Sequence, residues 1–415
     1  MFSFRKDLAS LNRAEKLFIL FAMLTGFCIY SEYAIVRPAS QSIFLAIFSA
    51  KAYPTVWLAT VPLNLSVIYL YNHFLPRFGP LRMMAALVGI IAGIHLLCGL
   101  LLPIFPQLIF FHFCWKDIYI LLMFQQLWSM IHSTIQPERA KYIYGMIFGV
   151  GTCGGILGSL IPGLLATRFG STQMFFFTIP IYALLLFAYI KAYHLSGARN
   201  LSASIEPEQT KAREGFLLII RNRYLLSILL LVVFMQVTVA IVEYQFSHQL
   251  ELAIPALDQR TAYFGKMISI INSLSLILQF IGGMLFIGWL GLRKSHFVIP
   301  VILLGFAVGQ WVNPCFAIAA ITYSFTKSID YSIFGVIREM LFVPLALDEK
   351  FRAKAVIDVF AYRTSKALAS FMILGLQWAV GSAVFTLSSY LSFAIFGGWF
   401  ILVGVMFTKF NPART

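Results

Sequence analysis

The chain of 415 residues is too apolar for a soluble protein, since 60% of its residues are hydrophobic and only 11% are charged. Soluble globular domains carry about 25% charged residues, so this much apolar surface cannot face water. The formal net charge of +15 does not indicate nucleic-acid binding, because basic residues in such a chain belong to the loops that orient a membrane protein.

Apolar runs of about 20 residues, the length that crosses a bilayer as a helix, recur along the chain. They predict an all-α integral membrane protein with twelve transmembrane helices. The first run follows several basic residues without a small-residue cleavage site, which indicates an uncleaved first helix. The expected helices span residues 17–36, 54–75, 83–105, 117–135, 142–166, 172–190, 224–246, 266–288, 296–311, 314–336, 353–378 and 383–407.

One extended polar stretch interrupts this series, at residues 191–223. Its serines, glutamates and proline are typical of a linker. We therefore expect an N-terminal six-helix half in residues 1–190, a cytoplasmic linker in 191–223 and a C-terminal six-helix half in 224–415.

Two short repeats support this division. Ala34–Arg37 (AIVR) recurs as Ala240–Glu243 (AIVE), and Arg139–Lys141 (RAK) recurs as Arg352–Lys354, each about 210 residues further along. Parallel pseudo-symmetric halves are typical of the major facilitator architecture, in which the substrate binds between the halves near the middle of the bilayer.

Lys and Arg residues gather in alternate connections between the expected helices, as they do in cytoplasmic loops. This asymmetry predicts that both termini and the central linker are cytoplasmic. The basic residues expected on the opposite side are few: Lys51, Lys116, Arg168, Arg260 and Lys266.

Ionisable side chains inside the expected helices are the most informative feature of the sequence. Each costs roughly 2.5–3.5 kcal/mol in a membrane helix, so it needs a partner, a water-filled cavity or a function. A purely structural pairing or an extension of the side chain to the interface is the alternative for each. Lys327 and Asp330 lie three residues apart on one helical face, so we expect them to neutralise each other. The charged residues are Arg37, Glu243, Lys327, Asp330, Asp358, Arg363 and Lys366.

Two of these charges, Arg363 and Lys366, have the same sign and lie three residues apart, which is unfavourable unless an anion lies between them. Asp358 can neutralise only one of them. An excess of positive charge facing a cavity predicts an anionic substrate, a carboxylate or a phosphate. Arg37 and Glu243 end the repeated motif in the two halves, so they either hold opposite ends of a substrate or pair as a gate.

Other motifs are less specific. His132 in the fourth helix either relays protons or forms a structural hydrogen bond. The fifth helix has GxxxG spacings, which favour close helix packing. We find no phosphate-binding loop for ATP hydrolysis, no metal-ligand spacing and no catalytic motif, so we expect a protein that is not an enzyme and has no cofactor. The glycines of the fifth expected helix are Gly145, Gly149, Gly151, Gly154, Gly155 and Gly158.

The C-terminal half carries a resemblance to a known family. Residues 331–345 (YSIFGVIREMLFVPL), 352–358 (RAKAVID) and 363–366 (RTSK), together with the AIVE segment that ends at Glu243, resemble the conserved blocks of the bacterial and plastid ATP/ADP translocases. The resemblance spans nearly the whole chain. It implies a multi-pass protein of a bacterial inner membrane that exchanges nucleotides by alternating access.

The resemblance also implies roles for single residues. Glu243 and Lys366 match charged positions that the family uses for nucleotide transport, and Arg37 matches the arginine at the end of the first helix. The chain departs from the family where Ser40 stands in place of a lysine and Gln126 in place of a glutamate.

These departures leave other functions open. One alternative is a proton- or ion-coupled carrier of another organic anion, with His132, Glu243 or Asp358 as the titrating group. A second is a non-transporting membrane scaffold or receptor. The expected partners are a small anionic substrate and the lipid bilayer.

Overall fold

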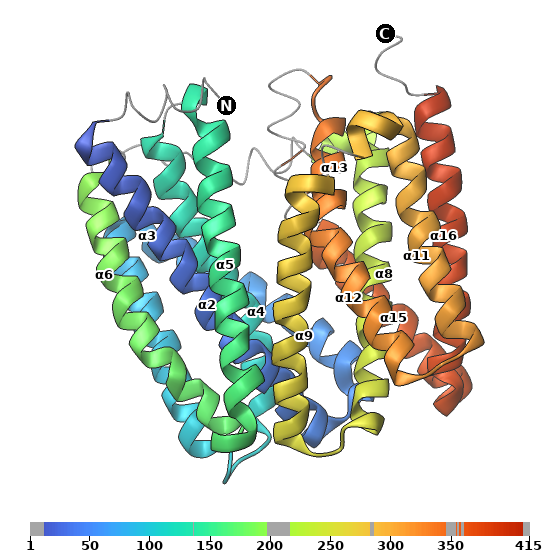
Figure 1. Cartoon of the computed structure of the whole chain (residues 1–415), viewed down its shortest axis with the longest axis horizontal. Helices are drawn as coiled ribbons and strands as arrows, with labels where there is room; N and C mark the ends of the chain where they lie inside the picture. The colour runs from blue at the N-terminus through green and yellow to red at the C-terminus, as the bar shows by residue number, and fades with distance from the viewer. Residues whose placement is uncertain are drawn as a thin grey trace. The chain divides into compact units, whose positions relative to one another are not determined.

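The structure, a computed structural model, describes residues 12–135, 137–196, 216–282, 286–345, 354, 357 and 361–409. Across these ranges the chain forms long helices joined by short turns, without a β-strand (Figure 1). The all-α fold predicted from the sequence is confirmed. The predicted linker at 191–223 lies largely outside the described residues, as does Asp358.

Nine helical segments within the described ranges are long and apolar enough to cross a membrane. One of them, Ala50–Leu101, has 52 residues, about twice the length that a bilayer requires. Its helix breaks at Gly79, where φ is 73° and ψ is 164°. Glycine adopts this conformation without steric cost, and Pro76 and Pro80 on either side lack the N–H that would continue the helix. The long segment therefore corresponds to two predicted helices, 54–75 and 83–105.

The helices group into two compact units. The first unit comprises the described residues within 1–48, 62–205 and 254–273. It contains α2 (Arg13–Phe48), most of α3 (Tyr53–Leu101), α4 (Leu108–Thr134), α5 (Pro137–Phe169), the short 3₁₀ helix η2 (Thr172–Thr178), α6 (Ile179–Leu195) and most of α9 (Leu257–Ile277).

The second unit comprises the described residues within 49–61, 206–253 and 274–415. Two segments group differently from the halves expected from the sequence. Residues 49–61 belong to the second unit, and residues 254–273 belong to the first. The two six-helix halves remain a prediction. The second unit contains α8 (Arg223–Ala253), α11 (Gly291–Val312), α12 (Phe316–Ile329), the π-helical turn η6 (Asp330–Phe334), α13 (Gly335–Leu341), α15 (Tyr362–Val380) and α16 (Val384–Lys409).

Each unit has its own apolar core. In the first unit, aliphatic and aromatic residues such as Ile29, Ile118 and Tyr119 are fully buried. In the second unit, residues such as Met235 and Trp399 are fully buried. Large apolar side chains also cover the outside of both units, as expected where lipid replaces water as the surrounding solvent.

The glycines of α5 allow α2 to approach its backbone closely. A Cβ atom on Gly154 would collide with the carbonyl group of Phe27, and one on Gly158 would collide with that of Ser31. The close packing predicted from the glycine spacing is confirmed at these positions. Gly145 in the same helix has open space around the position of a Cβ atom.

Three of the basic residues expected on the opposite side lie well inside helices. Lys116 is in α4 and 2% exposed, and Arg260 and Lys266 are in α9. The predicted helix 117–135 begins directly after Lys116. Its ammonium group is 2.8 Å from the Asp117 carboxylate, and this pairing allows α4 to begin further upstream, at Leu108.

We predict that Gly158→Ala destabilises the first unit by about 1–3 kcal/mol, because the added methyl group must displace the backbone of α2. Thermal unfolding of the purified protein in detergent measures the change. Gly145→Ala in the same helix is the matched control, and it should be neutral or stabilising because alanine favours a helix and meets no neighbour. Equal stability of the two variants would contradict the packing described here.

Candidate functional site

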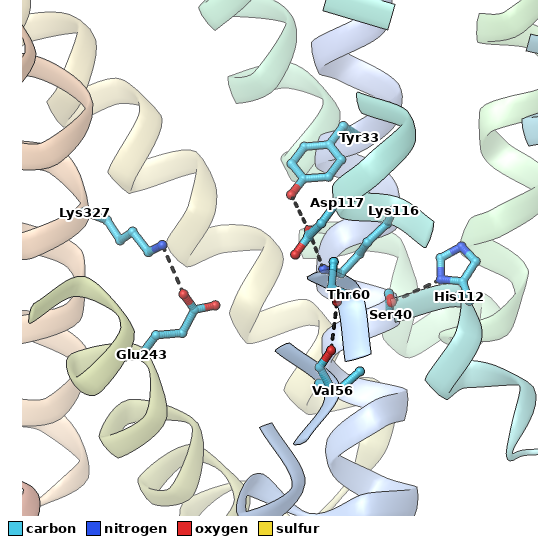
Figure 2. A network of polar contacts seen from close by, with 9 residues as sticks. All are labelled: Tyr33, Ser40, Val56, Thr60, His112, Lys116, Asp117, Glu243 and Lys327. Carbon is cyan, nitrogen blue, oxygen red and sulfur yellow. Dashed lines mark hydrogen bonds and ion pairs between the residues drawn. The ribbon is translucent and has the colours of Figure 1, made fainter. Parts of the chain in front are cut away.

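A buried ion pair joins two helices of the second unit. The Lys327 ammonium group on α12 lies 3.1 Å from the Glu243 carboxylate on α8 (Figure 2). Both residues are buried, at 8% and 5% exposure. The low dielectric of such a position strengthens the attraction but makes either charge costly alone.

Aromatic rings on α12 and η6 hold the same lysine. Its Nζ atom lies 5.7 Å from the centre of the Tyr323 ring and 5.8 Å from that of Tyr331. These residues are four positions before and after Lys327, so all three lie along one helical face. The faces of the rings attract the cation, and Lys327 is therefore fixed by a carboxylate and two tyrosines.

Asp330 has a different partner from the one expected. The side-chain amide of Gln236 on α8 donates a hydrogen bond of 2.7 Å to its carboxylate. Lys327 is near enough to attract this carboxylate, but the ion pair that it forms at 3.1 Å is with Glu243, so Asp330 shares the lysine with an acid on another helix. Gln236 and Glu243 are seven residues apart and share one face of α8, which the sequence of α12 alone cannot reveal.

Lys366 lies on α15 and is half-buried. Its ammonium group is 5.1 Å from the centre of the Trp57 ring, a buried residue of the same unit. Further along α15, the Gln377 amide donates a 2.8 Å hydrogen bond to the Tyr244 hydroxyl. Tyr244 is the residue after Glu243, so this hydrogen bond ties α15 to α8 at that level of the helix.

The contacts given above do not include three of the predicted substrate residues. Asp358 lies outside the described residues, and only the backbone of Arg363 is described, within α15. Arg37 belongs to the first unit, where it is half-buried in α2. The roles of these three residues remain predictions.

The two positions where the sequence departs from the translocase pattern are buried and hydrogen-bonded. Ser40 on α2 lies 3.1 Å from the Nδ1 atom of His112 on α4 (Figure 2). Gln126 on α4 accepts a 2.5 Å hydrogen bond from the Tyr71 hydroxyl and donates one to the carbonyl of Pro80, beside the break in α3. Gln126 therefore holds α4 against the break in α3.

His132 lies exposed near the end of α4. Its ring is 5.6 Å from the ring of Trp128 and 5.2 Å from that of Tyr144, between ring centres. The role of this histidine remains a prediction.

Sequence reasoning missed a polar cluster inside the first unit. Glu32 on α2 is fully buried, and its Oε2 atom accepts hydrogen bonds from the hydroxyls of Tyr119 on α4, at 3.3 Å, and Tyr182 on α6, at 2.8 Å. The Tyr182 oxygen is also 2.8 Å from Nδ1 of His95 on α3. A lone acidic residue within the expected helix 17–36 was the signal available in the sequence.

A second ion pair lies near this cluster. Lys116 and Asp117 are adjacent on α4, and the Tyr33 hydroxyl donates a 3.2 Å hydrogen bond to Asp117 (Figure 2). The Lys116 ammonium group also lies 3.9 Å from the centre of the Phe113 ring. Within the described residues, no group of His, Cys, Asp and Glu side chains is arranged to hold a metal ion.

Comparison with known protein families gives one match. The family described as "TLC ATP/ADP transporter" matches residues 107–312 and 312–410. The ADP,ATP carrier protein 1 of Chlamydia muridarum is 25% identical over 403 residues, covering 86% of this chain and 73% of that protein. The ADP,ATP carrier protein 3 of Rickettsia typhi is 26% identical over 300 residues, covering 62% of this chain and 60% of its own length.

Solved structures show the same architecture. The nucleoside transporter NupG aligns with 96% of this chain and 100% of its own, with a TM-score of 0.65 and 11% sequence identity. A bacterial homologue of the iron transporter ferroportin, in an inward-facing state, covers 94% of this chain and 99% of its own, with a TM-score of 0.61 and 14% identity. The predicted major facilitator fold is confirmed.

We predict that Lys327→Met lowers stability by about 3–5 kcal/mol, because Glu243 then remains buried without its cation. Adding Glu243→Gln removes the unpaired charge and should restore most of the loss. Thermal unfolding and the yield of monodisperse protein in detergent measure both effects.

Asp330→Asn is the matched second change, because asparagine can still accept the hydrogen bond from Gln236. The double variant Lys327→Met with Asp330→Asn should stay as unstable as Lys327→Met alone. If Asp330→Asn restored stability and Glu243→Gln did not, Asp330 would be the partner of Lys327 after all.

Proposed function

Because the chain belongs to the TLC ATP/ADP transporter family, we propose that it exchanges nucleotides across a membrane by alternating access. ATP and ADP are the first pair to test, since they give the related chlamydial and rickettsial carriers their names. The placement of Glu243 and Lys366 supports the proposal most strongly. These two charges of the translocase pattern lie on α8 and α15, two helices of the second unit that pack against each other.

Lys366 is the residue that we assign to a phosphate group of the substrate. Its half-buried ammonium group lies beside the ring of Trp57, which attracts the cation without neutralising its charge. A lysine held in this way can form a charge-assisted hydrogen bond with a phosphate oxygen.

Glu243 acts in this proposal through its ion pair with Lys327. Alternating access requires contacts that form in one state of the transporter and break in another. A buried pair whose members lie on different helices is suited to this role, because a phosphate can compete with the carboxylate for the lysine. Substrate binding would then be coupled to the separation of α8 from α12.

Ser40 and Gln126 favour a second candidate. Both take the place of a charged residue in the translocase pattern, and both side chains make hydrogen bonds within the first unit. A binding site with fewer charges fits a smaller organic anion carried together with a proton or another ion. In both cases we propose a multi-pass protein of a bacterial inner membrane with twelve helices and cytoplasmic termini.

Transport by the purified protein in liposomes separates the two candidates. Labelled ATP, ADP, nucleoside monophosphates and simple organic anions are offered outside, with or without unlabelled nucleotide inside. Nucleotide exchange predicts uptake that requires the internal nucleotide. Uptake of an organic anion that follows an ion gradient without counter-substrate would favour the second candidate instead.

We predict that Lys366→Gln reduces the apparent affinity for nucleotide by roughly 10- to 150-fold, the equivalent of a charge-assisted hydrogen bond of about 1.5–3 kcal/mol. Insertion and folding should be unchanged, because glutamine is also compatible with a half-buried position. Concentration-dependent exchange in liposomes measures the affinity.

Lys409→Gln, at the exposed end of α16, is the matched control for the loss of one positive charge. It should exchange nucleotide as the unaltered chain does. Normal affinity of the Lys366→Gln variant would show that the lysine has a structural role.

A further inference from the structure

We propose that Glu32, Tyr182 and His95 form a proton-binding site in the first unit, with Glu32 as the group that holds the proton and His95 as the group through which it enters. The ligand is a proton and the class of activity is proton coupling of transport. This inference depends on the protein being a transporter but not on nucleotides being its substrate.

The surroundings of Glu32 suit a group that changes its protonation state. The residue is fully buried, and within the described part of the chain no lysine or arginine forms an ion pair with it. Its Oε1 atom has no hydrogen-bond partner there. A carboxylate without a cation is unfavourable in such a position, whereas a neutral carboxylic acid is not.

Other acids of the described residues are held differently. Glu243 is paired with Lys327, and the half-buried Asp117 is paired with Lys116. The buried Asp330 accepts a hydrogen bond from the Gln236 amide and is attracted by Lys327. A nearby cation favours the ionised form of a carboxyl group. Among these four acids, Glu32 is the one whose described contacts are all hydroxyl groups.

A chain of hydrogen bonds leads from Glu32 to an imidazole. The Tyr182 hydroxyl donates to Oε2 of Glu32, so its oxygen must accept from Nδ1 of His95. Thr178 supports this tautomer, because its hydroxyl donates to the carbonyl of Phe175 and must likewise accept from Nδ1, at 3.3 Å. The Nε2 atom of His95 is then unprotonated, and it has no partner in the described structure.

This arrangement can transfer one proton from His95 to Glu32 through Tyr182. A proton that binds Nε2 of His95 makes the ring an imidazolium, which releases its Nδ1 proton to the Tyr182 oxygen. Tyr182 in turn releases its own hydroxyl proton to Oε2 of Glu32. The chain ends with a neutral carboxylic acid, a neutral tyrosine and a neutral imidazole protonated at Nε2. Every hydrogen bond has reversed its direction, and the sequence of steps runs equally in the opposite sense.

The groups around the site are consistent with this role. From α4, Tyr119 donates to Glu32, and His112, Lys116 and Asp117 lie nearby on the same helix. The rings of His112 and His95 are 5.2 Å apart between centres, so the charge of an imidazolium at one disfavours a second at the other. From α5, the closest approach to α2 in this region is Gly158, next to Ser31, which brings no titratable group.

Infrared spectroscopy of the full chain in detergent tests the proposal without any substrate. The protein is titrated from about pH 4 to about pH 10, the range in which buried carboxyl groups change state. We expect a carbonyl band of a buried carboxylic acid that disappears on raising the pH and is absent from Glu32→Gln. The Glu15→Gln variant, which alters a water-accessible acid of the same helix, should keep the band.

Liposomes loaded with a pH-sensitive dye test the route of the proton. The unaltered chain should move protons when substrate is transported, and Glu32→Gln should lose this movement. Tyr182→Phe keeps the ring but removes the connecting hydroxyl, so proton movement should slow by at least about tenfold while the infrared band of Glu32 remains. Thermal unfolding confirms that both variants are folded.

A band that remains in Glu32→Gln, or the absence of any titrating band in the unaltered chain, would overturn the proposal. Proton movement at an equal rate in Tyr182→Phe would overturn the route through His95. The infrared result is independent of transport, so failure of nucleotide exchange leaves it interpretable. Conversely, nucleotide exchange without a titrating Glu32 would contradict only this inference.

Discussion

The cost of a charge in a low-dielectric interior governs the arrangement of both units. Each buried ionised side chain must be compensated by groups on its own or neighbouring helices, and the partners decide which helices lie together. Lys327 on α12 requires Glu243 on α8, and Lys116 requires Asp117, which in turn is fixed by Tyr33 on α2. Apolar packing supplies most of the contact in each unit, but it does not by itself select one helix face over another.

Close helix packing makes these polar contacts possible. The backbone of α2 approaches that of α5 at Gly154 and Gly158, where a side chain would not fit. A different face of α2 then presents Glu32 to the tyrosines of α4 and α6. Small residues at one face and polar residues at the other therefore fix the rotation of α2 about its axis, which hydrophobicity alone leaves undefined.

Apolar runs predict the helices well because the bilayer requires about 20 apolar residues for each crossing, whatever their order. They predict partners poorly, since partners come from other helices. The spacing of Lys327 and Asp330 suggested a pair within one helix, but Glu243 from α8 takes the lysine and Gln236 takes the aspartate. The i,i+3 rule describes isolated helices in water and contains no information about a neighbouring helix.

Glu32 also illustrates that the sequence of one helix does not predict its partners on other helices. In the sequence it is a single acid in an apolar run, and its partners Tyr119, Tyr182 and His95 lie far along the chain. The chain has 18 tyrosines, so no local pattern marks these residues as a cluster. The fold class and the family follow from sequence, because each depends on many positions at once. A buried site depends on a few residues from several helices, and it emerges only when those helices are placed.

The contrast between Glu32 and Glu243 separates two ways of using a buried acid. Glu243 has the ammonium group of a lysine as its partner, which favours its ionised form, and its contact is exchanged by moving a helix or by competition from another anion. Glu32 has hydroxyl groups as partners, and these serve equally as donors to a carboxylate and as acceptors from a carboxylic acid. Its charge can therefore change while the helices stay in place. A transporter with both kinds of acid in separate units can respond to substrate and to protons through different groups, so that a substitution in one unit alters one response without removing the chemistry of the other.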